Sequence, residues 1–296
     1  MLFRGGFFIS NLTNIEDNSN FKKHDKIAFL GPNGTFTHEA ASTLQGELVS
    51  YCSIPSVMNS VVDDTCDKCI VPIENSIEGP VGITLDFLAN QINLNIEKEI
   101  IIPISHNLLI DRGSNNENIS VDNVKVVYSH SQALAQCQNY LETHNMKTHF
   151  TLSTAAAAKS IKGQAEIAAI GTLKAAEIYD LDILDSNIHD IKNNQTRFII
   201  LSKNKSKMTT NDKTSILFSL FDDNPGGLHD ILGVFAENNV NLTKIESRPS
   251  KEGLGKYIFF VDFEGHQDSE IIKDILKIIK TKTSFLKILG SYPIAK

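Results

Sequence analysis

The sequence has few cysteines and no excess of positive charge. Four cysteines in 296 residues are too few for the disulfide framework of a secreted protein, so a reducing, cytoplasmic environment is predicted. Lys and Arg number 28 against 35 Asp and Glu, and the formal net charge of −7 argues against nucleic acid or an anionic membrane as a partner. An anionic ligand would therefore need a local site of its own.

Long hydrophobic runs and a secretory signal are also missing. No stretch of about 18 apolar residues occurs, so nothing in the sequence is expected to span a membrane. The N-terminus lacks the apolar core and small-residue cleavage site of a signal peptide, and residues 1–25 are expected to form a loose leader. The length and the apolar content of 41% predict about two globular domains.

One cysteine pair has the spacing of a metal or redox motif. Cys66 and Cys69 form a CxxC, but no second CxxC or HxxxH pair follows to complete a zinc site. We favour Cys69 as the first buried residue of a strand, with zinc or redox chemistry as the alternative, and expect no metal.

From residue 26 the chain repeats a short apolar strand, a polar or glycine turn, and a helix. Strands are expected at 27–30, 47–52, 69–73, 124–128, 148–152 and 166–170, and helices at 38–44, 55–64, 81–89, 133–141, 155–161 and 172–179. Two runs of three units predict two α/β lobes facing each other across a cleft lined by helix N-termini. Lobe 1 would comprise about 26–110 and 185–201, and lobe 2 about 111–184.

Polar side chains stand where several of these strands end, which is where open α/β sheets bind ligands. They include Thr35, Glu74, Asn75, Ser76, Ser129, Gln132, Ser153 and Thr154. Each also has a plainer interpretation as a turn residue or helix cap.

The segment Asn194–Phe198 places a hydroxyl and a guanidinium at the mouth of an apolar strand. Thr196 can donate or accept a hydrogen bond, and Arg197 matches carboxylates as a rigid fork, which suits an anionic substrate. Alternatively, Thr196 is an ordinary strand residue and Arg197 a surface charge. Neighbours in a strand point to opposite faces, so Arg197 is expected to point away from Thr196. A structural salt bridge therefore fits Arg197 as well as a substrate contact does.

Taken together, these segments resemble the prephenate dehydratase family. The resemblance runs from about residue 26 to 201 and is carried, in order, by 31–36, 72–76 with Gly79, 129–137, 153–155, 175–179 and 194–198. It implies a two-lobed fold like a periplasmic binding protein and conversion of prephenate to phenylpyruvate, water and CO₂, with no cofactor. Ser131 and Asp180 replace the proline and glycine that are usual in the family.

The resemblance also assigns site residues. Thr196 is implied as the residue most tied to activity, with Glu74 and Ser129 as further catalytic candidates. Our hypothesis is that Thr196 donates to the leaving ring hydroxyl, or only orients a water or relays from Glu74, while Arg197 or helix N-termini hold a carboxylate. The expected substrate-binding residues are Asn75, Ser76, Gln132, Gln136, Thr35, Ser153, Thr154, Asn194, Arg197 and Phe198.

Residues 202–213 have the composition of a linker, and a βαββαβ pattern over 214–291 predicts a ferredoxin-like module. Two of its segments resemble the signature loops of the ACT domain, with Gly227 in place of the usual alanine. The resemblance implies allosteric inhibition by L-phenylalanine at a domain interface, in a homodimer or homotetramer. The implied effector residues are Asn224, Pro225, Gly226, Gly227, Leu228, Glu246, Ser247, Arg248 and Pro249.

Rival functions stay open at this point. Arogenate dehydratase performs the same chemistry on the aminated substrate, and the sequence does not separate the two. A bilobed solute-binding protein without catalysis would not need Thr-Arg-Phe and normally carries a signal peptide, and an ACT-bearing transcription regulator would need a basic helix-turn-helix. The leading 25 residues are expected to be too short for the chorismate mutase helices that some family members carry.

Overall fold

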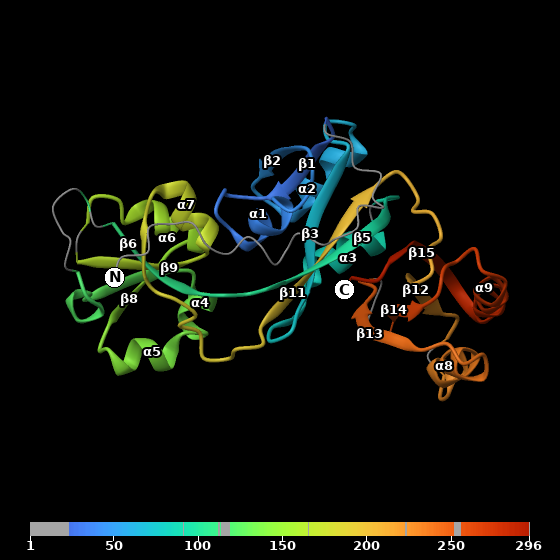
Figure 1. The fold of residues 1–296 in the computed structure, drawn as a ribbon. Helices are drawn as coiled ribbons and strands as arrows, with labels where there is room; N and C mark the ends of the chain where they lie inside the picture. The colour runs from blue at the N-terminus through green and yellow to red at the C-terminus, as the bar shows by residue number, and fades with distance from the viewer. Residues whose placement is uncertain are drawn as a thin grey trace.

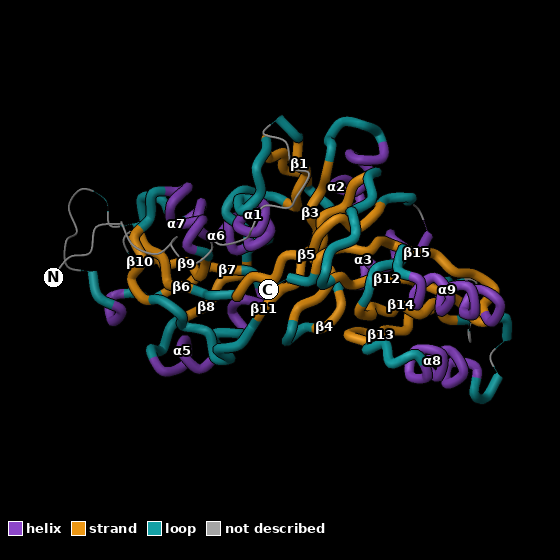
Figure 2. Tube along the Cα trace, turned by 45° about the vertical axis from the view of Figure 1, so that its right-hand side comes forward, coloured by secondary structure: helices purple, strands orange, loops and turns teal. Residues whose placement is uncertain are grey.

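The computed structural model describes residues 24–90, 92–111, 113, 119–164, 166–222, 224–251 and 256–295, so nearly all of the expected leader lies outside the described residues. The described chain forms three bodies in a row, with lobe 1 between lobe 2 and a C-terminal module (Figures 1 and 2). Within these ranges no helix is long and apolar enough to cross a membrane.

Lobe 1 is built on a sheet of order β2-β1-β3-β11-β5. Strands β1 to β3 run parallel, whereas β11 arrives from lobe 2 and pairs antiparallel with both β3 and β5. Apolar side chains fill both faces of the sheet. The elements are β1 (Lys26–Leu30), α1 (Phe36–Ala41), β2 (Glu47–Tyr51), α2 (Ile54–Val62), β3 (Lys68–Asn75), β4 (Gly79–Pro80), α3 (Gly82–Asn90), β5 (Asn95–Pro103) and β11 (Gln195–Ser202).

Lobe 2 has a sheet of order β10-β6-β9-β7-β8. Its elements are β6 (Asn107–Ile110), η1 (Val121–Asn123), β7 (Val126–Ser129), α4 (Ser131–Ala135), α5 (Gln138–Thr143), β8 (Lys147–Phe150), α6 (Thr154–Ser160), β9 (Ile167–Gly171), α7 (Leu173–Tyr179) and β10 (Asp182–Asp185).

Two details of lobe 2 differ from the sequence-based expectation. Strand β6 was expected in lobe 1, but it pairs antiparallel with β9 and belongs to the lobe 2 sheet. The helix expected at 133–141 is broken at Cys137, whose φ of −119° and ψ of 20° leave the helical region. Apolar periodicity alone shows neither the partner of a strand nor a break of one residue in a helix.

Two connections join the lobes and run side by side. Residues 104–106 lead from β5 into lobe 2, and residues 186–194 lead back to β11. The N–H of Ile104 donates to the carbonyl of Asn194 at 2.8 Å, and the N–H of Ile188 donates to the carbonyl of His106 at 2.9 Å. The pair of segments forms the hinge between the lobes.

Local sequence explains where several helices begin and end. Ser53, Ser153 and Thr172 cap their helices by accepting a hydrogen bond from the N–H three residues on, as side chains of this kind commonly do. Asp180 ends α7 in the left-handed region, with φ of 51° and ψ of 60°. That backbone conformation favours glycine, which accounts for the glycine that is usual at this position in the family.

The C-terminal module confirms the predicted βαββαβ pattern. Its sheet has the order β13-β14-β12-β15. Helices α8 and α9 cover one face, and the other face packs against lobe 1, where Leu217 and Tyr292 share a core with Ile96 and Leu201. The elements are β12 (Asp212–Leu220), α8 (Gly227–Glu237), β13 (Leu242–Pro249), β14 (Tyr257–Glu264), α9 (Glu270–Lys282) and β15 (Thr283–Pro293).

Gly290 allows the backbone of β15 to approach β5 closely. Its φ is +152°, and a Cβ added there would lie 2.8 Å from the nitrogen and 2.5 Å from the oxygen of Ile96. Both the backbone conformation and the lack of space therefore require glycine.

We predict that Gly290→Ala destabilises the protein by about 1–3 kcal/mol, because backbone atoms at the domain interface must move apart. Urea denaturation followed by circular dichroism measures the effect. Gly233→Ala is the matched control, since it lies inside α8 with open space around it and should be neutral or stabilising by up to about 1 kcal/mol. Equal stability of the Gly290 variant and the wild type would contradict the prediction.

Candidate active site

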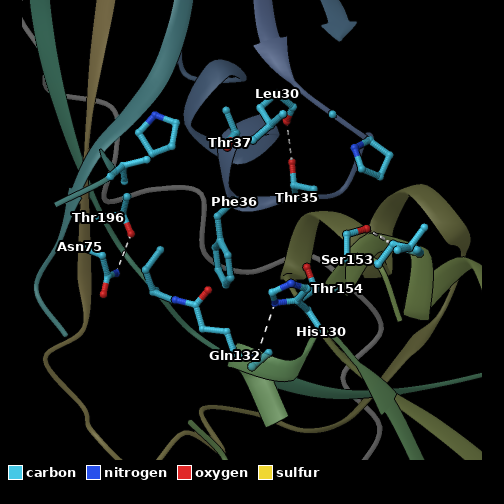
Figure 3. A pocket seen from close by; sticks show the side chains of 18 of the residues that line it. Leu30, Thr35, Phe36, Thr37, Asn75, His130, Gln132, Ser153, Thr154 and Thr196 are labelled. Carbon is cyan, nitrogen blue, oxygen red and sulfur yellow. Dashed lines mark hydrogen bonds between the residues drawn. The ribbon is translucent and has the colours of Figure 1, made fainter. Parts of the chain in front are cut away.

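A cleft of about 880 Å³ lies between the lobes. Side chains reach it from strand ends of lobe 1, from the hinge, and from the helix N-termini of both lobes, as expected (Figure 3). Polar and aromatic residues that line it include Thr35, Phe36, Thr37, Asn75, His106, His130, Gln132, Gln136, Ser153, Thr154, Asn194, Thr196 and Phe198.

Thr196 and Asn75 form one rung of the β11–β3 ladder and are joined by their side chains. The Asn75 Oδ1 accepts hydrogen bonds from the N–H groups of Ile77 and Glu78 at 2.9 and 3.0 Å, which fixes the orientation of the amide. Its Nδ2 therefore donates to Thr196 Oγ1 at 2.9 Å. Because the Thr196 oxygen accepts this bond, its own hydrogen is available to be donated into the cleft.

A hydrogen-bonded chain continues from this rung into lobe 2. Asn194 Oδ1 accepts from Asn75 Nδ2 at 2.8 Å, and Asn194 Nδ2 donates to Gln136 Oε1 at 3.0 Å. The Gln136 Nε2 donates in turn to Glu78 Oε1 at 3.2 Å. Gln136 follows α4 of lobe 2, so this network holds the threonine rung to both lobes across the hinge.

His106 ends the network and is neutral. The Gln136 oxygen already accepts from Asn194, so His106 Nε2, at 2.9 Å, is assigned as a second donor to it. His106 Nδ1 is buried without a hydrogen-bond partner. Burial lowers the pKa of His106 to about 4, with the Gln136 bond acting in the opposite direction and His189 lowering it further.

The cleft offers neutral hydrogen-bond donors in place of cations. Thr35 and Ser153 cap α1 and α6, and Thr154 begins α6, so hydroxyls and first-turn N–H groups border the cleft. Among the described residues that line it, none is Lys or Arg. Carboxylates in this cleft would be held by dipoles and hydroxyls.

Arg197 and Glu74 form the next rung of the ladder and do not face the cleft. Arg197 Nη2 lies 3.2 Å from Glu74 Oε2, and Arg197 Nη1 lies 2.7 Å from Asp262 Oδ2 in the C-terminal module. The expectation that they lie with Thr196 is therefore corrected: strand alternation turns both to the opposite face. Of the two interpretations of Arg197, the geometry matches the salt bridge.

Two serines expected at the site do not line the cleft. Ser129 is fully buried, and its hydroxyl donates to the carbonyl of Ile170 within the lobe 2 sheet at 2.8 Å. Ser76 Oγ accepts from the N–H of Gln195 at 2.9 Å and stabilises the entry to β11. Neither residue belongs to the lining of the cleft, and the hydrogen bonds of both stabilise the neighbouring backbone.

Several residues of the site were not selected from the sequence, among them His106, Phe36 and Glu78. His106 and Phe36 line the cleft with their rings in an edge-to-face arrangement, 5.4 Å between centroids, and Glu78 accepts from Gln136. His106 lies in a polar break after the apolar strand β5, which is the same signal that selected Asn75. His106 was not selected because the segment 92–110 is largely β-branched and apolar and was interpreted as extended strands with a break at Pro103.

The two predicted effector loops lie at one end of the C-terminal sheet. Strands β12 and β13 both pair antiparallel with β14 and so run parallel to each other. The loop after β12, which contains Asn224–Leu228, therefore lies at the same end as Glu246–Pro249. Arg248 points to lobe 1, where its Nη2 contacts Asp86 Oδ1 of α3 at 2.9 Å.

Fold and site together define a bilobed α/β domain of binding-protein type whose cleft presents a threonine hydroxyl, with a ferredoxin-like regulatory module attached. The sequence profile of prephenate dehydratase matches residues 27–206, and that of the ACT domain matches residues 214–280. This chain belongs to the prephenate dehydratase family.

Relatives support the same assignment over nearly the whole chain. A prephenate dehydratase of Methanocaldococcus jannaschii is 42% identical over 90% of this chain and 98% of its own length. A bifunctional chorismate mutase/prephenate dehydratase of Aquifex aeolicus is 44% identical over 92% of this chain and 74% of its own. The solved prephenate dehydratase of Arthrobacter aurescens in complex with L-Phe has a TM-score of 0.81 and 33% identity, covering 91% of this chain and 90% of its own.

The neutral state of His106 predicts a loss of stability in mild acid. Its pKa is about 4 in the folded protein and 6.5 ordinarily, so the unfolded chain binds the proton more tightly. The contribution of neutral His106 is complete above pH 6.5 and is lost as the pH falls towards 4, at about 1.4 kcal/mol per unit. By pH 5 this amounts to about 2 kcal/mol.

Urea unfolding at pH 7 and pH 5 tests this with His106→Gln, whose amide can keep a donor towards Gln136. The variant should lose less stability than the wild type between the two values. His229→Gln, at a side chain that is 88% exposed, controls for the loss of a histidine. Parallel losses in all three proteins would contradict the assignment.

Proposed function

We propose that this protein converts prephenate to phenylpyruvate, water and CO₂ and is feedback-inhibited by L-phenylalanine. Membership of the family and the relatives over nearly the full chain support the reaction. The observation that carries the site is the donation from Asn75 Nδ2 to Thr196 Oγ1, which leaves the threonine hydrogen for the substrate. The remaining roles follow from the geometry of the cleft.

The reaction breaks two bonds and makes an aromatic ring. The C–C bond to the ring carboxylate breaks to release CO₂, its electrons enter the ring, and the C–O bond opposite breaks to release hydroxide. Negative charge therefore develops on the leaving oxygen, and a fixed donor at that oxygen lowers the barrier. Thr196 donates this hydrogen bond, and the departing hydroxide takes up a proton to become water.

The other cleft residues bind and orient the substrate. Asn75 and Asn194 hold Thr196 in place, while Thr35, Gln132 and the Ser153–Thr154 cap supply donors for the two carboxylates. The half-buried Gln136 links the lobes, and Phe198, two residues after Thr196 on β11, joins the apolar core of lobe 1 at the edge of the cleft. Ser129, Ser76, Glu74 and Arg197 are not retained as direct substrate contacts.

The composition of the cleft supports prephenate over arogenate as the substrate. Arogenate carries an ammonium group where prephenate has a keto group, and a buried ammonium requires a carboxylate partner. Among the described lining residues there is no Asp or Glu. A keto group needs only hydrogen-bond donors, which the cleft supplies.

Removing the Thr196 hydroxyl should lower kcat for prephenate by about 100- to 1000-fold, the usual cost of losing one preorganised donor, and Thr196→Ser should retain part of the activity. Phenylpyruvate formation by the purified protein measures this, with arogenate assayed in parallel. Ser129→Ala is the control that should keep its turnover. Near-full turnover by a folded Thr196→Ala variant would disprove the role of Thr196.

L-Phenylalanine should suppress prephenate turnover by binding near Asn224–Leu228 and Glu246–Pro249. Support comes from the ACT match and from the A. aurescens relative solved with L-Phe. Titration of L-phenylalanine into the assay, with L-alanine as the control, measures the response. Unchanged turnover at saturating L-phenylalanine would contradict the regulation.

The homodimer or homotetramer and the cytoplasmic location stay predictions. Light scattering with and without L-phenylalanine measures the oligomeric state.

A further inference from the structure

The β11–β3 ladder presents different side chains on its two faces. Thr196 pairs with Asn75 and faces the cleft, whereas the next rung, Arg197 with Glu74, faces the C-terminal module. The register of the ladder shifts immediately after Arg197, which marks a β-bulge. Bulges commonly re-aim neighbouring side chains next to active sites. The backbone that aims Thr196 is therefore the same backbone that carries Arg197.

An interdomain ion cluster covers the second face. Arg197 Nη1 lies 2.7 Å from Asp262 Oδ2 and 3.2 Å from Glu99 Oε2. Lys213 Nζ lies 3.1 Å from Glu99 Oε1, and Lys244 Nζ lies 2.9 Å from Glu74 Oε2. Three carboxylates thus face three cations. The cluster consists of Glu74, Glu99 and Arg197 from lobe 1 and Lys213, Lys244 and Asp262 from the ACT domain.

Burial makes this cluster sensitive to geometry. The Glu99 side chain is completely buried, and those of Asp262 and Lys244 are 6% and 10% exposed. Burial alone would lower the pKa of Arg197, but the carboxylates of Asp262 and Glu99 raise it above its ordinary value. Separating one partner from such a cluster leaves an uncompensated buried charge. Glu74 is 38% exposed, but its partner Lys244 is largely buried, so a displaced β13 either draws Glu74 with it or leaves the Lys244 ammonium without this partner.

Strand β13 connects this cluster to the effector loop. Lys244 and Arg248 are partly buried on the face of β13 that contacts lobe 1, while Ile245 and Ser247 between them are exposed. Lys244 contacts Glu74 on β3, and four residues further Arg248, within the predicted effector loop, contacts Asp86 on α3. One strand thus carries both the effector loop and a direct contact to the residue next to Asn75.

We propose that Lys244 and Asp262 of the ACT domain are positioning residues for Thr196, acting through Glu74 and Arg197. They hold the Arg197–Glu74 pair, which is next to the Thr196–Asn75 pair in the ladder and so fixes the direction of the threonine hydroxyl. A shift of β13 on effector binding changes that direction. The inference rests on the proposed function and goes beyond it by naming the contacts that couple the two sites.

The test compares Lys244→Met with the conservative Lys244→Arg in the full-length protein. Lys251→Met is the matched control: its ammonium also contacts lobe 1, 2.9 Å from Asp86, but it is 65% exposed and this partner lies on α3, not on β3 or β11. For each variant, kcat and KM for prephenate are measured, and L-phenylalanine affinity is measured by calorimetry. The coupling factor is the change in prephenate KM or kcat at saturating L-phenylalanine.

We expect Lys244→Met to bind L-phenylalanine as the wild type does and to lower kcat more than it changes KM. Its coupling factor should be near one, whereas that of the wild type should lie in the usual range of about 5- to 150-fold. Lys244→Arg should restore both values, and Lys251→Met should behave as the wild type. Full coupling in Lys244→Met would overturn the proposal. Loss of its L-phenylalanine affinity would also overturn it, since Lys244 would then belong to the effector site.

A second variant decides the matter if Lys244→Met does not fold. Lys244→Gln keeps a neutral donor towards Glu74 but removes the charge, so its coupling factor should fall below that of Lys244→Arg. Full coupling in a folded Lys244→Gln variant would overturn the proposal. Failure of the proposed function is distinct, because it is seen in the wild type as no turnover of prephenate.

Discussion

The pairing of β11 between β3 and β5 is the interaction on which the rest of the structure depends. It returns the chain from lobe 2 to lobe 1, closes the hinge, and sets Thr196 opposite Asn75. A slip of one residue would exchange the two faces of β11 and present Arg197 to the cleft. The buried neighbours on both sides, Phe198 in the core and Asp262 across the interface, exclude that slip.

Charge is distributed unequally between the two faces of this ladder. The described lining of the cleft contains neutral donors, whereas the opposite face holds paired carboxylates and cations. Hydroxyls and helix N-termini can stabilise a dianionic substrate in such a cleft without a charged counter-ion. The ion pairs lie instead at the interface between lobe 1 and the ACT domain, where they hold the two in a fixed relative position.

The sequence predicted the α/β lobes, the ferredoxin-like module and the convergence of Asn75, Gln132 and Thr196, because apolar periodicity and polar strand ends are local signals. It did not predict that β6 joins lobe 2, since the partner of a strand is decided by long-range packing. Alternation showed that Thr196 and Arg197 face opposite ways. Only the structure shows that the ACT sheet covers Arg197. It also shows that Glu74 lies on this face, beside Arg197.

The core shared by lobe 1 and the ACT domain joins these two bodies as closely as the parts of one domain. Tyr292 and Leu217 pack with Ile96 and Leu201, while lobe 2 meets lobe 1 through the paired hinge segments and a hydrogen bond from Thr172 to the carbonyl of Gly34. The boundary seen in the sequence at residues 202–213 therefore lies beside a continuous apolar core. Cutting the chain there would expose apolar surface on both pieces, so the linker separates two segments of sequence without separating two independent folding units.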